Sequence, residues 1–229
     1  MTECTQKSFE FARYFSRKVE ARFDGGTMTS DGGAVLLREA DRRIGLLDRV
    51  AVCFVDGRNP ELIRHRVREM VAQRILGLAL GYEDLNDHEQ LRRDPMLGVL
   101  SGKREAGRKP LAGKSTLNRL ELSTANPSRY KKIACRQEGF DALLVELFLE
   151  ARPKPPKEIV LDLDVTDVPL HGEQEGRFFH GYYNTYCYLP LYIFCGEDLL
   201  CARLRTAGQD AAAGCVEELA RVVAQIRSR

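Results

Sequence analysis

The sequence lacks the segments that mark exported and membrane-spanning proteins. No apolar run approaches the ~20 residues that a membrane helix needs. Residues 1–20 contain no apolar stretch of the kind found in a secretory signal. The 7 cysteines include no C-x-x-C pair, and an odd number of thiols without an export signal favours a reducing compartment. We therefore expect a cytoplasmic protein whose cysteines are inert and mostly buried.

Familiar catalytic and metal-binding patterns are missing as well. The 4 histidines form no metal-ligand spacing with one another or with cysteine, so we expect hydrogen-bonded structural residues. No G-x-S-x-G pattern marks a catalytic serine. "GKST" at residues 113–116 resembles the end of a phosphate-binding loop, but Arg108 occupies the position of the loop's first glycine. We expect a plain helix start there instead, with Ser115 or Thr116 near the cap.

The sequence does contain enough apolar residues for a packed core, together with a division of charge. The chain has 229 residues, 44% of them apolar and 30% charged, which fits one large or two modest domains. Residues 1–157 hold 29 Lys and Arg against 22 Asp and Glu, whereas residues 158–229 hold 6 against 11. A basic module joined to an acidic one fits a polyanion binder attached to a cation-binding site. Charge alone equally allows two solvated surfaces of opposite bias.

The clearest boundary is "RPKPPKE" at residues 152–158, because its prolines block a helix and favour extended chain. We predict a domain over residues 1–155 and a second over residues 156–229. The patterns before the prolines predict helices over 33–44, 59–82 and 139–151, with shorter helices within 84–94 and after 113. The patterns after them predict strands over 158–166, 177–196 (two strands or one bent strand) and 198–205, then a helix over 208–226.

Residues 92–136 form a strongly basic stretch, with 12 cations against only 3 acids. Such a stretch is typical of proteins that bind the phosphate backbone, and its binding should depend strongly on salt. An ordinary solvated face is the alternative. The cations that we expect to bind DNA are Arg92, Arg93, Lys103, Arg104, Arg108, Lys109, Lys114, Arg119, Lys131 and Lys132.

The stretch "EIVLDLDVTDVPLHG" at residues 158–172 places acids within an apolar strand. Because strand positions alternate faces, one face is wholly apolar and the other carries Asp162 and Asp164. Two like charges on one face repel each other unless the face is wet or a cation lies between them. Mg²⁺ prefers one or two carboxylates with waters and phosphate oxygens, so these residues are candidate ligands. Acids that satisfy a turn before Pro169 are the equally good alternative.

Four segments together resemble the DDE transposases of bacterial insertion sequences, in the group 1 DDE domain class. Two of them lie after the prolines: "LDLDVTDVPLHGEQEGRFFHGYYNTYCYLPLYIFCGEDLLCARLR" and "GQDAAAGCVEELARVVAQIR". Two lie before them: "FDGGTMTSDGGAVLLREADRR" and "GYEDLNDHEQLRRDP". The resemblance covers nearly the whole chain, and the combined match is far more specific than any single motif in it.

This resemblance implies a ribonuclease-H-like core in which three acids, Asp, Asp and Glu, hold two Mg²⁺ ions. The first acid lies in a D-x-T pattern, which here is Asp164-Val165-Thr166, so Asp164 is the first candidate for a catalytic metal ligand. Asp162 on the same face is the second candidate, and Asp167 ranks third. The implied partner is DNA, at the terminal inverted repeats and at the target. The implied location is the bacterial nucleoid, and the resemblance is compatible with a homodimer of the intact enzyme.

The sequence also departs from the family pattern, because the second aspartate and the glutamate are expected beyond residue 229. We therefore expect an α+β fragment: a mainly helical, basic N-terminal module followed by the first half (β-β-β-α) of a ribonuclease-H-like domain. Such a half leaves one edge of its first strand without a partner. A transposase fragment is the leading hypothesis. The alternatives are a catalytically dead DNA-binding remnant that acts as a decoy or regulator of full-length transposase, and a decayed reading frame.

Overall fold

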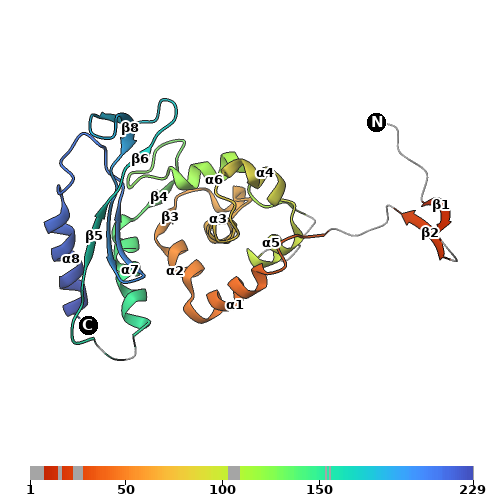
Figure 1. Ribbon diagram of the computed structural model, residues 1–229, viewed down its shortest axis with the longest axis horizontal. Coiled ribbons are helices and arrows are strands. Elements are labelled where there is room, and N and C mark those ends of the chain that lie inside the picture. The colour runs from red at the N-terminus through yellow and green to blue at the C-terminus, as the bar shows by residue number, and fades with distance from the viewer. Residues whose placement is uncertain are drawn as a thin grey trace. The chain divides into compact units, whose positions relative to one another are not determined.

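The computed structural model describes residues 8–14, 17–22, 28–102, 109–152, 154 and 156–228. The fold is mixed α+β, as the sequence predicts. The contacts divide the chain into two compact units (Figure 1). The first comprises residues 1–47 and 59–122, and the second residues 48–58 and 123–229. Residues 123–152 therefore pack with the C-terminal strands, whereas the sequence places a domain boundary after residue 155. No helix within the described ranges has the length and apolarity to cross a membrane.

The first unit is mainly helical. Its strands β1 (Ser8–Tyr14) and β2 (Arg17–Arg22) form an antiparallel pair. Short 3₁₀ turns precede two of its helices, η1 (Pro60–Leu62) and η2 (Leu85–Asp87). The helices that lie wholly in this unit are α1 (Ala34–Ile44), α3 (Val67–Ala79), α4 (His88–Leu91), α5 (Pro95–Leu100) and α6 (Lys114–Glu121).

The core of the first unit contains a neutral polar cluster around Gln73. The Gln73 side chain donates to the Ala112 carbonyl at 2.8 Å and accepts from the Ala112 amide at 3.0 Å. Its Nε2 also lies 3.1 Å from Nδ1 of the fully buried His88. Burial, reinforced by the charge of Arg74, lowers the pKa of His88 and keeps the imidazole neutral. For His88, the expectation of a hydrogen-bonded structural histidine is confirmed.

The predicted helix over residues 59–82 is wrong in its first third. Asn59 does cap a turn, since its side chain accepts from the Glu61 amide at 3.1 Å. That turn is only the 3₁₀ segment η1, and Ile63 is already extended. The α-helix begins at Val67, where the Glu69 carboxylate accepts from the Arg66 amide at 3.3 Å. An Asn-Pro pair starts a helical turn, but it does not ensure that the helix continues.

The second unit contains two three-stranded antiparallel sheets: the main sheet, in the order β10-β9-β5, and a smaller sheet of shorter strands, in the order β6-β8-β7. Strand β3 pairs with β4. Helix α2 (Leu46–Val52) begins in the first unit and ends in the second. The strands are β3 (Phe54–Asp56), β4 (Ile133–Cys135), β5 (Asp162–Val165), β6 (Val168–Pro169), β7 (Phe178–His180), β8 (Thr185–Tyr188), β9 (Leu191–Cys195) and β10 (Asp198–Arg203).

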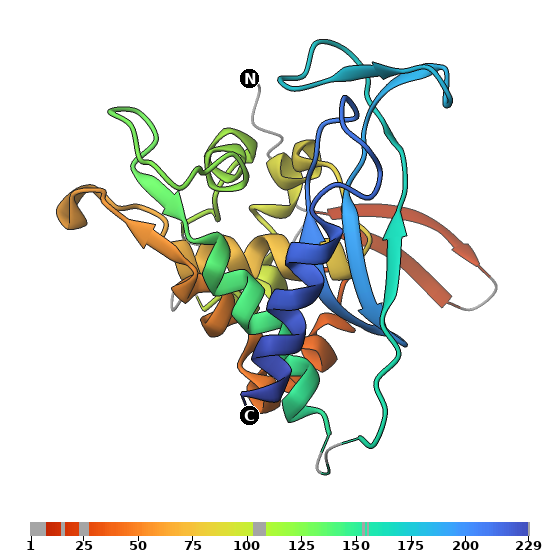
Figure 2. The same cartoon turned by 90° about the vertical axis from the view of Figure 1, so that its left-hand side faces the viewer.

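Helices α7 (Gln137–Glu150) and α8 (Cys215–Arg227) pack against strand β10 of the sheet β10-β9-β5 and against each other, as Figure 2 shows. Their contacts form one apolar core with β9 and β10, which includes Val145, Phe148, Ile193, Leu200, Cys201 and Val222. Ile159 and Leu161, which precede β5, pack on the same core. The apolar face of residues 158–166 is therefore covered at Ile159 and Leu161, whereas Leu163 remains 43% exposed and Val165 packs on a second cluster around Cys187.

A charged cluster joins the two helices to β10. Arg203 donates to both oxygens of Asp141 in α7, at 2.8 and 2.6 Å, and also to Glu218 in α8. Burial acts to lower the pKa of Arg203, but its hydrogen bonds to Glu218 and Asp141 outweigh burial and raise it. Burial likewise acts to raise the pKa of Glu218, and its bonds with Arg203 and Arg221 reverse that effect.

The strand predictions for the second unit need correction. The segment 177–196 forms three strands, β7, β8 and β9, rather than one or two. The predicted strand over 158–166 shortens to β5, and β6 follows it after a two-residue link. The order β-β-β-α therefore describes β5, β9, β10 and α8, with the small sheet inserted between the first two. Strands of two to four residues are too short to show a clear alternation.

Candidate metal-binding strand and nucleic-acid surfaces

Strand β5 holds Asp162 and Asp164 on the face of the sheet that turns away from α7 and α8. In the register with β9, Asp162 lies opposite Phe194 and Asp164 opposite Tyr192. Leu163 lies opposite the buried Ile193, on the other face. Residues directly opposite one another in an antiparallel pair share a face. The predicted alternation is therefore confirmed, and the two acids share an outward face with two aromatic rings.

This outward face is wet. Asp162 and Asp164 are both exposed, while Tyr192 and Phe194 are half-buried. The rings of Tyr192 and Phe194 lie with centroids 6.1 Å apart. Alternate residues of a strand lie about 7 Å apart, so water can separate the two carboxylates. Neither a desolvation penalty nor strong repulsion is therefore imposed by the fold, and a cation can reach both groups.

Strand β5 is an edge of the sheet, because β9 is its one partner among the described strands. The sequence predicts this open edge. Asp167 follows β5 in the link to β6 and is half-buried. Burial raises the pKa of the Cys187 thiol, and the negative charge of Asp167 adds to this effect. The third-ranked acid therefore lies near the buried Cys187, whereas the first two face outward.

The donor set of β5 suits a hard cation but does not complete a site. Carboxylate oxygens on one exposed strand face are the ligands that Mg²⁺ takes in ones and twos, with waters and phosphates filling the rest. The described residues contain no group of three or more His, Cys, Asp or Glu placed to hold a metal. The residues present thus fit part of a magnesium site.

The predicted DNA-binding cations of the first unit differ in their surroundings. Arg92 is half-buried and pairs with Glu89 at 3.4 Å, and the Lys114 ammonium donates to the Asn86 side chain at 2.9 Å. Arg93, Lys109 and Arg119 are exposed. Lys103, Arg104 and Arg108 lie outside the described residues.

The predicted cations of the second unit are concentrated in one turn before β4. Lys131 and Lys132 are exposed, and the Lys131 amide donates to the Ser128 hydroxyl at 3.0 Å. The Arg129 guanidinium lies 5.8 Å from the centroid of the exposed Tyr130 ring. We call residues 128–132 the basic turn. Sequence reasoning left Arg129 and Tyr130 out of the DNA-binding set, although their spacing in the basic stretch offered a signal.

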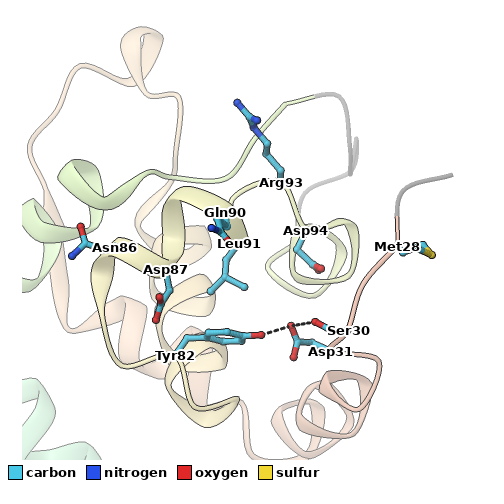
Figure 3. Close-up of a pocket in the computed structure, with 10 residues that line it drawn as sticks. All are labelled: Met28, Ser30, Asp31, Tyr82, Asn86, Asp87, Gln90, Leu91, Arg93 and Asp94. Carbon is cyan, nitrogen blue, oxygen red and sulfur yellow. Dashed lines mark hydrogen bonds between the residues drawn. The ribbon is translucent and has the colours of Figure 1, made fainter. Parts of the chain in front are cut away.

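The first unit also contains a hollow of about 560 Å³. Figure 3 shows the Tyr82 hydroxyl pointing at Asp31, to which it donates at 3.0 Å, while Arg93 points away from both. Bonding to Asp31 and burial raise the pKa of Tyr82. Asp87 and Asp94 also line the hollow, so its lining is acidic and unsuited to phosphate. Sequence reasoning missed this feature, because its residues come from three separate segments.

Comparison with known proteins places the chain in a family. The family model described as transposase DDE domain group 1 matches residues 11–229, which is nearly the whole chain. No curated protein and no solved structure matches it. The predicted resemblance is therefore confirmed, and the chain belongs to the group 1 DDE transposases.

Proposed function

We propose that this chain is the DNA-binding and first-acid portion of a transposase that moves an insertion sequence. The family implies DNA binding and generally uses a divalent metal. The observation that carries the proposal is the placement of Asp162 and Asp164. They lie together on an exposed face of a rigid sheet whose other face is packed by two helices. A carboxylate mounted on a packed strand is the support that a metal site requires.

In this proposal the sheet β10-β9-β5 and helix α8 form the first half of a ribonuclease-H-like domain. Asp164 is the first metal ligand, and Asp162 is the second candidate. Magnesium, when bound, activates a water or a 3′-hydroxyl for attack on a phosphodiester. The chain itself holds the carboxylate oxygens of Asp164 and Asp162 in place and leaves them accessible to a phosphate group.

The cations of residues 92–136 hold the DNA backbone in this proposal. The basic turn is the best-placed part, because it belongs to the same unit as Asp164 and exposes its lysines. Each phosphate that a cation neutralises should make binding fall more steeply with salt. The partners are the terminal inverted repeats and the target DNA, with a homodimer in the intact enzyme and a location at the bacterial nucleoid.

Binding and cleavage of DNA that carries the terminal repeats test the proposal. The 229-residue chain should bind duplex DNA with a steep dependence on salt, and it should not cut the DNA when Mg²⁺ is added. The double variant Lys131→Glu/Lys132→Glu should bind more weakly and reduce the salt slope by about 2. Lys157→Glu changes an exposed lysine outside the basic stretch and is the matched control.

Three outcomes separate the alternatives. Robust Mg²⁺-dependent cutting by the 229-residue chain would contradict the incomplete metal site. Binding without cutting, together with inhibition of a complete transposase, would favour the decoy. Absence of duplex binding even at low salt would refute the DNA-binding role altogether.

A further inference from the structure

The hairpin of β7 and β8 carries exposed aromatic rings that the proposed metal and backbone contacts do not use. Phe179 lies directly opposite Tyr186 in the register, so both side chains share one face of the small sheet. Their rings meet edge to face with centroids 5.4 Å apart. Phe179 remains 45% exposed and Tyr186 44% exposed. This face is therefore formed by packed rings that remain open to solvent.

A cation extends this face, and a further exposed ring, that of Tyr182, lies at the turn of the hairpin, where it packs edge to face on Tyr183 with centroids 5.0 Å apart. The Arg177 guanidinium lies over the Tyr186 ring, 4.7 Å from its centroid. Tyr182, in the turn between the strands, is 86% exposed. Asn184 closes the turn with a positive φ of 53°, a conformation that asparagine tolerates well. We call Arg177, Phe179, Tyr182 and Tyr186 the aromatic surface.

The opposite face of the hairpin already has a core. Cys187 is fully buried there with Leu189 and Ala207. The Phe178 ring packs so closely on Gly208 that a Cβ at that glycine would lie 3.1 Å from it. The hairpin therefore has packing partners on its other face, and the aromatic surface is not exposed for want of them.

The chain places this hairpin next to the acid strand. Strand β6, which follows β5 after a two-residue link, pairs with β8. The small sheet is thus fixed to the continuation of the strand that holds Asp164, and Figure 2 shows it beyond the end of β5. DNA held at Asp164 in the proposed function would therefore lie in the neighbourhood of these rings.

We propose that the aromatic surface stacks the unpaired bases of a DNA end, an inference that rests on the proposed function. Flat rings and a guanidinium plane bind the faces of bases in any sequence. A second copy of the chain is the weaker occupant. The three rings offer on the order of 350 Å² of exposed surface, whereas a stable protein interface needs about 800 Å² from each partner.

The test compares two probes on the full chain at equal salt. One is a fluorescent oligothymidylate of about 16 nucleotides, and the other is a blunt duplex of the same length. Tyr182→Leu should weaken binding of the oligothymidylate on the order of tenfold and leave the duplex unchanged. Tyr182→Phe, which keeps the ring, should bind both probes as the wild type does. Thermal melting of each variant should match the wild type, because Tyr182 is exposed.

The outcomes separate this inference from the proposed function. Wild-type binding of the oligothymidylate with no binding of the duplex would refute the proposed backbone surface and leave the stacking surface standing. Equal weakening of both probes in Tyr182→Leu, or no weakening of either, would overturn the stacking surface. A dimer in sedimentation that Tyr182→Leu dissociates would also overturn it, because the rings would then belong to a protein interface.

Discussion

The two faces of the sheet β10-β9-β5 in the second unit differ in chemistry and in exposure to solvent. The face toward α7 and α8 buries apolar side chains and closes around the Arg203 cluster. The other face leaves Asp162 and Asp164 exposed beside two half-buried rings. The same residue type, aspartate, therefore serves stability at Asp141 and remains available for a ligand at Asp164. The difference comes from where each aspartate lies: Asp141 belongs to α7 and faces Arg203, whereas Asp164 lies on the strand face that turns away from the helices.

The largest difference in stability between the faces should appear when a phenylalanine on each side of the sheet is replaced by alanine. Phe148 is buried in α7, and Phe148→Ala should lower the free energy of unfolding by about 3–5 kcal/mol. Phe194 on the outward face is half-buried, and Phe194→Ala should cost about 1 kcal/mol. Urea unfolding followed by circular dichroism measures both. Equal losses would mean that the outward face is also covered.

A smaller effect is expected from the charged cluster on the covered face. Arg203→Leu leaves the carboxylates of Asp141 and Glu218 without their main cation. Because the cluster is only partly buried, the variant should lose about 2–3 kcal/mol in the same assay. Arg177→Leu is the control, since its partner Glu173 is 91% exposed and the pair should contribute little. A loss below the control's would show that the cluster does not hold α7 and α8 to β10.

Lowering the pH should destabilise the covered face by a smaller amount, through the carboxylate of Glu218. The folded pKa of Glu218 lies below its ordinary value of 4.5, so its contribution is present above that pH. It is lost as the pH falls through the lowered folded value. The urea midpoint of the wild type should therefore fall more between pH 5 and pH 3 than that of Glu218→Gln. Parallel midpoint curves for the two proteins would argue against this linkage.

The alternation in "LDLDV" was sufficient to predict which face of β5 is apolar and which carries acids, because strand period is a local property. The Arg203–Asp141 contact joins residues 62 positions apart, and no local pattern encodes such a distance. Strands β6, β7 and β8 were missed or merged because each spans two to four residues. The start of α3 was missed because a valid cap at Asn59 serves a shorter turn.

The candidate site was predictable only in part for the same reason. Asp162 and Asp164 were found by periodicity and resemblance. Their aromatic neighbours Tyr192 and Phe194 depend on the register between β5 and β9, which the sequence does not reveal. The basic stretch was visible as a count of charges, but the pairing of Arg92 with Glu89 required coordinates.

Manganese, used as a paramagnetic substitute for Mg²⁺, tests most directly whether the outward face of β5 binds metal. The account predicts that added Mn²⁺ broadens the amide NMR signals of β5 and of Tyr192 before those of other segments. Asp164→Asn should remove most of this broadening while leaving the stability within about 0.5 kcal/mol of the wild type. Broadening confined to the acid-lined hollow around Asp31, with β5 unaffected, would contradict the account.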